Sequence, residues 1–412
     1  MKLLKKIEEF LPFLLPSLLV FSRTLADLTV IAISICFIYK TVKEKNYSFA
    51  HHPIFKYFII FLVYLIFINS TYSINYSDSL IYSLAFLRWP IFALAISYWI
   101  FTDKKSFKKL NLGLLITLTF FTLNLWYQYF IDSTGIFGLS ENNNGIRLSV
   151  PFSNNVIPGR FIIFMTFCLL STDYFYKKII GINHNENFIF MLLFLGLFTI
   201  YMTGERMSFL IFLSSFLLIA LVYIFFEKKN YPKIIFFLLM TILIILISFY
   251  FESSVYNRIL IESYEKIVNF SETDYGEAFL LGYEKWKNNI LIGGGLHQFK
   301  FIDPIHGYNF FKVKSSLLHS HNLPLNLLAE TGLIGLILFY SIILKIFFII
   351  LKNFQKNKDI IFFVINLNLI YIFFFPLHTH FKFTHNWINA SAWLVIGLII
   401  GMYNYYAKNQ SK

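Results

Sequence analysis

Two histidines and an asparagine precede a long apolar stretch in the last quarter of the chain. His319, His321 and Asn322 lie within residues 318–336, directly before that stretch begins at Leu323. Asparagine is a preferred N-cap, so we expect Asn322 to begin a helix, whose positive end would favour a neutral imidazole at His321. A neutral imidazole can accept a proton near pH 7. The sequence therefore predicts His321 as a general base and His319 as a supporting residue.

A second candidate group is arginine. Arg206 lies in the short polar run Thr203–Ser208, between two apolar stretches, and Arg147 and Arg258 are expected on the same face of the protein. Charges at membrane depth are costly and are often retained for function. A guanidinium can hold phosphate oxygens through two parallel hydrogen bonds. We therefore predict a basic site for an anionic substrate; the alternative is a tight helix–helix turn whose charges face lipid headgroups.

Two further motifs are interpreted as structural. Gly293–Gly295 lacks the strand–loop–helix setting and the lysine of a phosphate-binding loop, so we expect a turn there. His378, His380 and His385 have the side-chain chemistry of zinc ligands, but their spacing matches no known site. No metal and no cofactor is predicted.

The composition indicates a membrane protein. Of the 412 residues, 57% are hydrophobic and 14% are charged, whereas soluble domains are roughly 45–50% apolar and about 25% charged. The net charge is +13, and the positive residues lie in short clusters between apolar stretches, which membrane topology explains better than nucleic-acid binding; no nucleic-acid partner is predicted. We predict an all-α polytopic protein with about twelve spans, at residues 8–23, 25–42, 54–70, 79–101, 110–130, 156–176, 187–203, 206–226, 233–251, 332–351, 359–377 and 387–407.

The lysines of the connections give the expected orientation. They concentrate in alternate connections, which places both termini in the cytoplasm by the positive-inside rule. The long outer segment, about 252–331, contains two helix-like stretches, Val255–Phe270 and Ala278–Ile292. We accordingly divide the chain into spans at 1–251, a periplasmic cap at 252–331 that carries His321, and spans at 332–412.

Three segments carry a resemblance to a known family. From His321 to Gly335, a histidine, an asparagine, nine residues and Gly-x-x-Gly beginning at Gly332 resemble the signature of the bacterial O-antigen ligase and polymerase family. Arg206 matches the essential arginine that ends that family's short external turn, and residues 286–299 are similar to its amphipathic helix followed by Gly-x-Gly. The predicted spans and the single large outer loop also fit this family.

The resemblance implies an inner-membrane glycosyltransferase of the C-type (GT-C) architecture that needs no metal. The donor would be a glycan on undecaprenyl diphosphate, and the acceptor would be a sugar hydroxyl of lipid A–core for a ligase or another lipid-linked repeat for a polymerase. His321 would take the proton of the attacking hydroxyl, while Arg206, with Arg258 and Arg147, would bind the diphosphate in the periplasm. Supporting residues would be His319, Asn322, Gly332 and Gly335. A lipid-linked sugar flippase is the alternative from another class, but no internal repeat is evident.

The chain departs from the family pattern at one position. Family members carry a second essential arginine at the start of the amphipathic helix, whereas residues 274–277 here contain none. Arg258, Arg147, Lys285 and Lys287 are the candidates to supply that charge.

Overall fold

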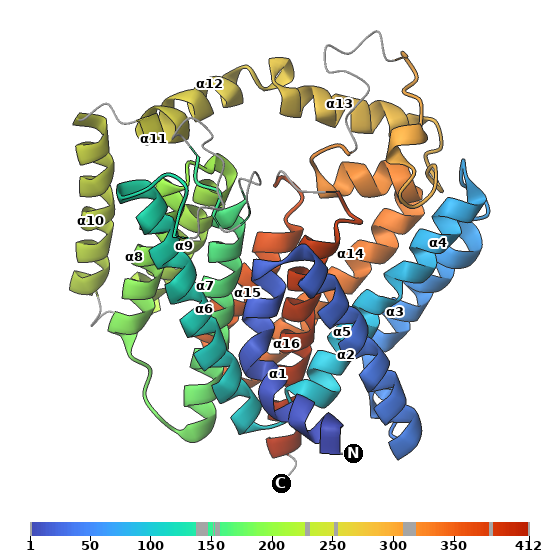
Figure 1. Ribbon diagram of the computed structural model, residues 1–412, viewed down its shortest axis with the longest axis horizontal. Coiled ribbons are helices and arrows are strands. Elements are labelled where there is room, and N and C mark those ends of the chain that lie inside the picture. The colour runs from blue at the N-terminus through green and yellow to red at the C-terminus, as the bar shows by residue number, and fades with distance from the viewer. Residues whose placement is uncertain are drawn as a thin grey trace. The chain divides into compact units, whose positions relative to one another are not determined.

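The computed structural model describes residues 2–136, 147–150, 152, 157–226, 231–250, 254–307, 319–378 and 382–410 (Figure 1). Throughout these ranges the regular elements are α-helices and short 3₁₀ or π turns, without any strand, so the all-helical prediction is confirmed. The chain divides into two compact units, each assembled from separated segments. Unit 1 comprises 1–25, 100–267 and 350–372, and unit 2 comprises 26–99, 268–349 and 373–412. The division at residues 251 and 331 stays a prediction.

Several helices have the length and composition of membrane spans. Within the described residues, six are long and apolar enough to cross a membrane: Arg23–Glu44, Tyr76–Ile100, Lys104–Phe130, Arg206–Phe226, Leu323–Asn357 and Asn386–Tyr406. Four further apolar helices are shorter: Pro53–Asn69, Glu186–Met202, Pro232–Ile247 and Ile360–Phe374. These helices are consistent with a polytopic membrane protein; the number of twelve spans and the C-type architecture stay predictions.

Unit 1 contains most of the helices around the arginines. Its elements are α1 (Lys2–Phe21), α6 (Lys104–Phe130), α7 (Pro158–Ile180), α8 (Glu186–Met202), α9 (Arg206–Phe226), α10 (Tyr231–Tyr250), α11 (Ser254–Tyr256), η5 (Asn257–Ile261) and most of α12 (Glu262–Val268) and α15 (Ile360–Phe374). Helices α8, α9 and α10 are neighbours (Figure 1). Their contact is aromatic, with the rings of Phe190 and Phe237 stacked at 6.1 Å.

Unit 2 contains the histidines. Its elements are most of α2 (Arg23–Glu44), η1 (Ser48–His51), α3 (Pro53–Val63), η2 (Tyr64–Asn69), α4 (Tyr76–Phe86), α5 (Arg88–Ala95), η3 (Ile96–Ile100), η6 (Phe270–Glu272), α13 (Asp274–Lys287), η7 (Phe299–Phe301), most of α14 (Leu323–Asn357) and α16 (Asn386–Gln410). Helix α16 packs so closely on α5 that a Cβ at Gly397 would lie 2.7 Å from the Ala93 carbonyl oxygen. Small residues permit such close approach between apolar helices.

The predicted helices of residues 252–331 are found with different ends. The stretch expected over 255–270 is divided into α11, the wider turn η5 and α12. The second helix begins at Asp274 rather than 278, because the Thr273 hydroxyl accepts a hydrogen bond from the Gly276 N–H at 3.1 Å and caps it there. It ends at Lys287 because the following residues run instead along α14.

Helix α14 begins at Leu323, as the asparagine cap predicts, and is broken at Gly332. This glycine has φ 66° and ψ −174°, a conformation that interrupts the helical hydrogen bonding. Residues 290–295 supply partners on both sides of the break. The bonds run from Leu333 N to Ile290 O (2.9 Å), Ile334 N to Leu291 O (3.1 Å), Gly294 N to Ala329 O (2.9 Å) and Gly295 N to Glu330 O (2.8 Å). The glycine-rich segment is therefore a backbone partner of α14, in agreement with its interpretation as structural.

Candidate functional site

The turn between α8 and α9 presents Arg206 at the start of α9. Helix α8 ends at Met202, and the hydroxyl of the C-cap residue Thr203 donates to the Ile200 carbonyl at 2.7 Å. Gly204 follows with φ 67°, a left-handed conformation that glycine adopts without steric cost. The turn can therefore be very short, and Arg206 is the first residue of the next helix.

Arg206 and Arg258 converge on one carboxylate oxygen. Arg206 Nη1 donates to Glu262 Oε2 at 3.1 Å, and Arg258 Nη1 lies 3.6 Å from the same oxygen. Arg258 Nε also donates to the Gly204 carbonyl at 3.0 Å, which fixes its guanidinium beside the turn. The arginine side chains are 18% and 17% exposed, and that of Glu262 is 43% exposed. Two positive charges thus meet at a partly open position.

Arg147 lies beside the same turn. The N–H of the next residue, Leu148, donates to the Thr203 carbonyl at 3.3 Å, and the charge of Arg147 acts on Glu205. The structure therefore brings together all three arginines that the sequence predicts for anion binding. We call Arg147, Arg206, Arg258, Glu205 and Glu262 the arginine cluster.

The second carboxylate of this cluster, Glu205, is buried. It accepts hydrogen bonds from the Gly159 N–H at 2.6 Å and from the Ser208 hydroxyl at 2.8 Å. Burial raises the pKa of Glu205, while these hydrogen bonds and the charges of Arg147 and Arg160 act in the opposite direction. The hydrogen bond from Gly159 also ties Glu205, and with it the turn, to the N-terminal end of α7.

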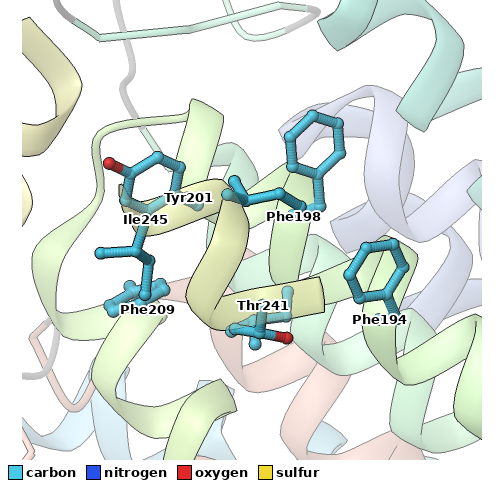
Figure 2. Close-up of a pocket in the computed structure, with 8 residues that line it drawn as sticks. Phe194, Phe198, Tyr201, Phe209, Thr241 and Ile245 are labelled. Carbon is cyan, nitrogen blue, oxygen red and sulfur yellow. The ribbon is translucent and has the colours of Figure 1, made fainter. Parts of the chain in front are cut away.

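An apolar pocket adjoins the arginine cluster within unit 1. It lies between α8, α9 and α10, and Figure 2 shows its lining side chains, six of which are labelled. Its lining consists of Phe194, Leu197, Phe198, Tyr201, Phe209, Thr241, Ile244 and Ile245. Tyr201 and Phe209 stand directly before and after the turn that carries Arg206, with their rings 5.6 Å apart. The turn with the basic, partly exposed side chains thus joins two helices that also line a small apolar recess.

In unit 2, Asn322 holds the start of α14 in two ways. Its Oδ1 accepts from the Leu325 N–H at 3.0 Å, which is the predicted cap, and its Nδ2 donates to the Pro376 carbonyl at 2.7 Å. The Ser320 hydroxyl donates to the Asn322 carbonyl at 2.9 Å. His321 stands between these two residues with φ 53°, an uncommon conformation for a residue other than glycine.

The imidazole of His321 is packed between rings. It lies edge-on to Tyr275, with ring centroids 5.3 Å apart, and its centroid is 4.1 Å from that of His319. Burial lowers the pKa of His321, and the nearby charge of Asp274 partly opposes this. The imidazole is therefore neutral at pH 7, as a proton acceptor requires. We call residues 319–322 the histidine loop.

A line of polar side chains continues from the histidine loop into α14. Asn322, Asn326 and Glu330 are spaced by four residues, so they share one helix face, and all three are buried. Asn326 Oδ1 accepts from the Phe383 N–H at 2.9 Å, and Asn322 Nδ2 donates to the Pro376 carbonyl in the same segment. The segment before α16 is thus held against the same helix that follows the histidine loop.

The two signature glycines have packing roles. A Cβ at Gly332 would lie 2.2 Å from the Leu291 carbonyl oxygen, and a Cβ at Gly335 would lie 3.1 Å from the Tyr64 ring. The Tyr64 hydroxyl donates to the Thr331 carbonyl at 2.6 Å. Both glycines therefore allow neighbouring chain segments to reach the broken part of α14.

The lysines considered as substitutes for the second arginine are engaged within unit 2. Lys285 Nζ donates to the Phe299 carbonyl at 2.6 Å, and burial lowers its pKa to about 8. Lys287 Nζ contacts Glu284 Oε1 at 3.0 Å. Of the four candidates, the two that lie with Arg206 are Arg258, which shares the Glu262 carboxylate, and Arg147, which lies beside the same turn.

No metal centre is seen in the described part of the chain, where no three His, Cys, Asp or Glu side chains form a group that could hold an ion. His378 and His385 lie in that part, but His380 lies outside the described residues.

Three side chains at these sites were missed by the sequence reasoning. Glu262 follows Arg258 by four residues, a spacing that predicts an ion pair on a helix and could have revealed it. Asp274 and Tyr275 reach His321 from almost fifty residues away, and no local pattern indicates such a contact.

Comparison with known families gives one match. Residues 191–340 match the family model described as O-antigen ligase. The matched range includes Arg206, Arg258 and the histidine loop, whereas Arg147 precedes it. No curated protein matches the chain.

Proposed function

We propose that the chain is an O-antigen ligase of the bacterial inner membrane, because residues 191–340 match the family model described as O-antigen ligase. It transfers a glycan from undecaprenyl diphosphate to a sugar hydroxyl of lipid A–core, on the periplasmic face. The observation that carries this proposal is the arginine cluster beside an apolar pocket. That combination suits a ligand with an anionic head and an apolar chain.

The donor supplies both parts of such a ligand. Its diphosphate binds Arg206 and Arg258, whose guanidinium groups can each form paired hydrogen bonds with phosphate oxygens. Arg147 adds positive charge at the same turn. The apolar side chains around the small recess between α8, α9 and α10 contact the part of the prenyl chain next to the diphosphate. Positive charge is then in place where negative charge grows as the glycan departs.

His321 acts on the acceptor. Its neutral imidazole takes the proton of the attacking hydroxyl while the acceptor oxygen bonds to the anomeric carbon. The bond from that carbon to the diphosphate oxygen breaks in the same step, so the configuration at the anomeric carbon is inverted. Asn322 and His319 orient the imidazole through the contacts of the histidine loop. No step in this scheme uses a metal, because the arginines neutralise the diphosphate.

A transfer assay with purified protein tests the proposal. The protein is reconstituted in vesicles with a labelled glycan on undecaprenyl diphosphate and with lipid A–core. The expected result is label joined to lipid A–core and release of undecaprenyl diphosphate. Label that only lengthens the lipid-linked glycan would instead assign a polymerase, and movement of donor across the bilayer without a new glycosidic bond would assign a flippase.

The surface glycans of a deletion strain provide an independent test. Loss of all long glycan from lipid A–core, with accumulation of lipid-linked polymer, is expected for a ligase. A single repeat remaining on the core would contradict that assignment and favour the polymerase.

A further inference from the structure

Glu262 is held differently from the other carboxylate of the arginine cluster. Glu205 is buried and accepts two short hydrogen bonds, from Gly159 and Ser208 rather than from an arginine. Glu262 is 43% exposed, and its contacts to Arg206 and Arg258 use the single oxygen Oε2, at 3.1 Å and 3.6 Å. An ion pair with this much exposure is weak and is readily exchanged for another anion.

The position that Glu262 occupies is where an anionic ligand would bind. A guanidinium can bind two oxygens, so a phosphate that displaces the shared carboxylate oxygen offers more acceptor oxygens to Arg206 and Arg258 than Glu262 does. Two residues that line the small apolar pocket, Tyr201 and Phe209, lie within a few residues of the same turn. A membrane offers many amphiphiles of this kind, because a phospholipid with an anionic phosphodiester also combines negative charge with apolar chains.

We propose that Glu262 is a specificity-determining residue: its carboxylate occupies the phosphate position and excludes singly charged phospholipids, while a doubly charged diphosphate displaces it. This inference rests on the proposed function, since it concerns the same anion site. A phosphodiester brings one negative charge, the same as the carboxylate it would replace. The carboxylate is attached to the chain, so its effective concentration at the arginines is high and it wins that competition. A diphosphate diester brings two negative charges to two guanidinium groups and therefore displaces the carboxylate.

Removal of the carboxylate should lower the donor KM in neutral lipid and make that KM sensitive to anionic lipid. In Glu262→Gln, the full-length protein in phosphatidylcholine vesicles should show a donor KM about two- to fivefold lower than wild type, the range that an exposed ion pair corresponds to. When phosphatidylglycerol is included, the KM of the variant should rise, whereas that of the wild type should change little. Glu265→Gln is the matched control, because Glu265 lies on α12 and is exposed.

A binding measurement separates this inference from the proposed function. The wild type and both variants are purified from vesicles that contain phosphatidylglycerol, and retained lipid is measured by native mass spectrometry. More phosphatidylglycerol on Glu262→Gln than on wild type and Glu265→Gln supports the inference, whether or not glycan transfer is detected. Equal retention in the three proteins would overturn it. A raised donor KM for Glu262→Gln in phosphatidylcholine alone would also overturn it, because Glu262 would then position the arginines for the donor.

Discussion

The arginine cluster and the histidine loop differ in the charge of their functional groups. The guanidinium groups of the cluster are charged, whereas the imidazole of His321 is neutral. Arg206 and Arg258 lie 3.1 Å and 3.6 Å from the carboxylate of Glu262, and their guanidinium groups carry a permanent positive charge. Around His321, burial outweighs the charge of Asp274 and favours the neutral imidazole. A phosphate contact needs a lasting charge, whereas a base needs a free lone pair. The two environments provide these properties separately, each within its own unit.

The backbone also differs between the two regions. The turn before Arg206 uses Gly204, which adopts φ 67° at no steric cost. The histidine loop places His321 itself at φ 53°, where a side-chain-bearing residue is disfavoured by about 1–2 kcal/mol. The contacts of Ser320 and Asn322 on either side hold this conformation. Strain of this kind is concentrated at functional sites, which supports the assignment of His321 as the base.

The largest effect is expected from the histidine loop. His321→Ala should reduce glycan transfer by about 10²–10⁴-fold, the usual contribution of a general base. Donor binding should persist, because the arginine cluster is intact. Transfer rate and donor affinity are measured on the same reconstituted protein, with the exposed His51→Ala as control. Wild-type transfer by His321→Ala would remove His321 from the mechanism.

The next largest effect is expected at the turn. Arg206→Lys keeps the charge but replaces a planar fork by a point charge, so kcat/KM should fall by roughly 10- to 100-fold. The loss should appear in donor affinity as well as in rate, in contrast to the loss at His321. Arg23→Lys, an exposed position on α2, should behave as wild type. Full activity of Arg206→Lys would exclude a role for paired hydrogen bonds at this position.

A stability effect is expected at the break in α14. Gly332→Ala places a Cβ 2.2 Å from the Leu291 carbonyl and demands φ 66° of alanine, so a loss on the order of 3 kcal/mol is expected. Gly181→Ala is a matched control, because Gly181 has φ 71° but meets nothing within 4 Å; its loss should be about 1 kcal/mol. Thermal unfolding in detergent, followed by size-exclusion chromatography, measures both. Equal losses would show that crowding at Gly332 is unimportant.

The smallest effect concerns pH. Because burial lowers the pKa of His321 below its ordinary value of 6.5, transfer should decline only as pH falls through that lowered pKa. The charge of Asp274 raises the same pKa, so Asp274→Asn should lower it further and move the decline to still lower pH. Rates are measured across acidic pH, with Asp303→Asn as control. A decline that moves to higher pH would contradict this account of the environment of His321.

Local features of both regions could be predicted from the sequence. The cap at Asn322, the glycine at the break of α14 and the turn that ends at Arg206 depend on residues close together in the chain, where spacing and propensity decide the structure. Contacts between distant segments could not be predicted in this way. The pairing of Arg206 with Glu262 and the approach of Tyr275 to His321 depend on tertiary packing, which no periodicity in the sequence reports.

The break in α14 has a consequence for how the protein is assembled. Four backbone hydrogen bonds of this helix come from residues 290–295, which are joined to it through residues 296–322. An apolar environment does not supply partners for open N–H and carbonyl groups, so a helix with this break is costly there on its own. Helix α14 can therefore take its final form only once residues 290–295 have reached it. Insertion of this helix during biosynthesis is thus coupled to folding of the preceding loop.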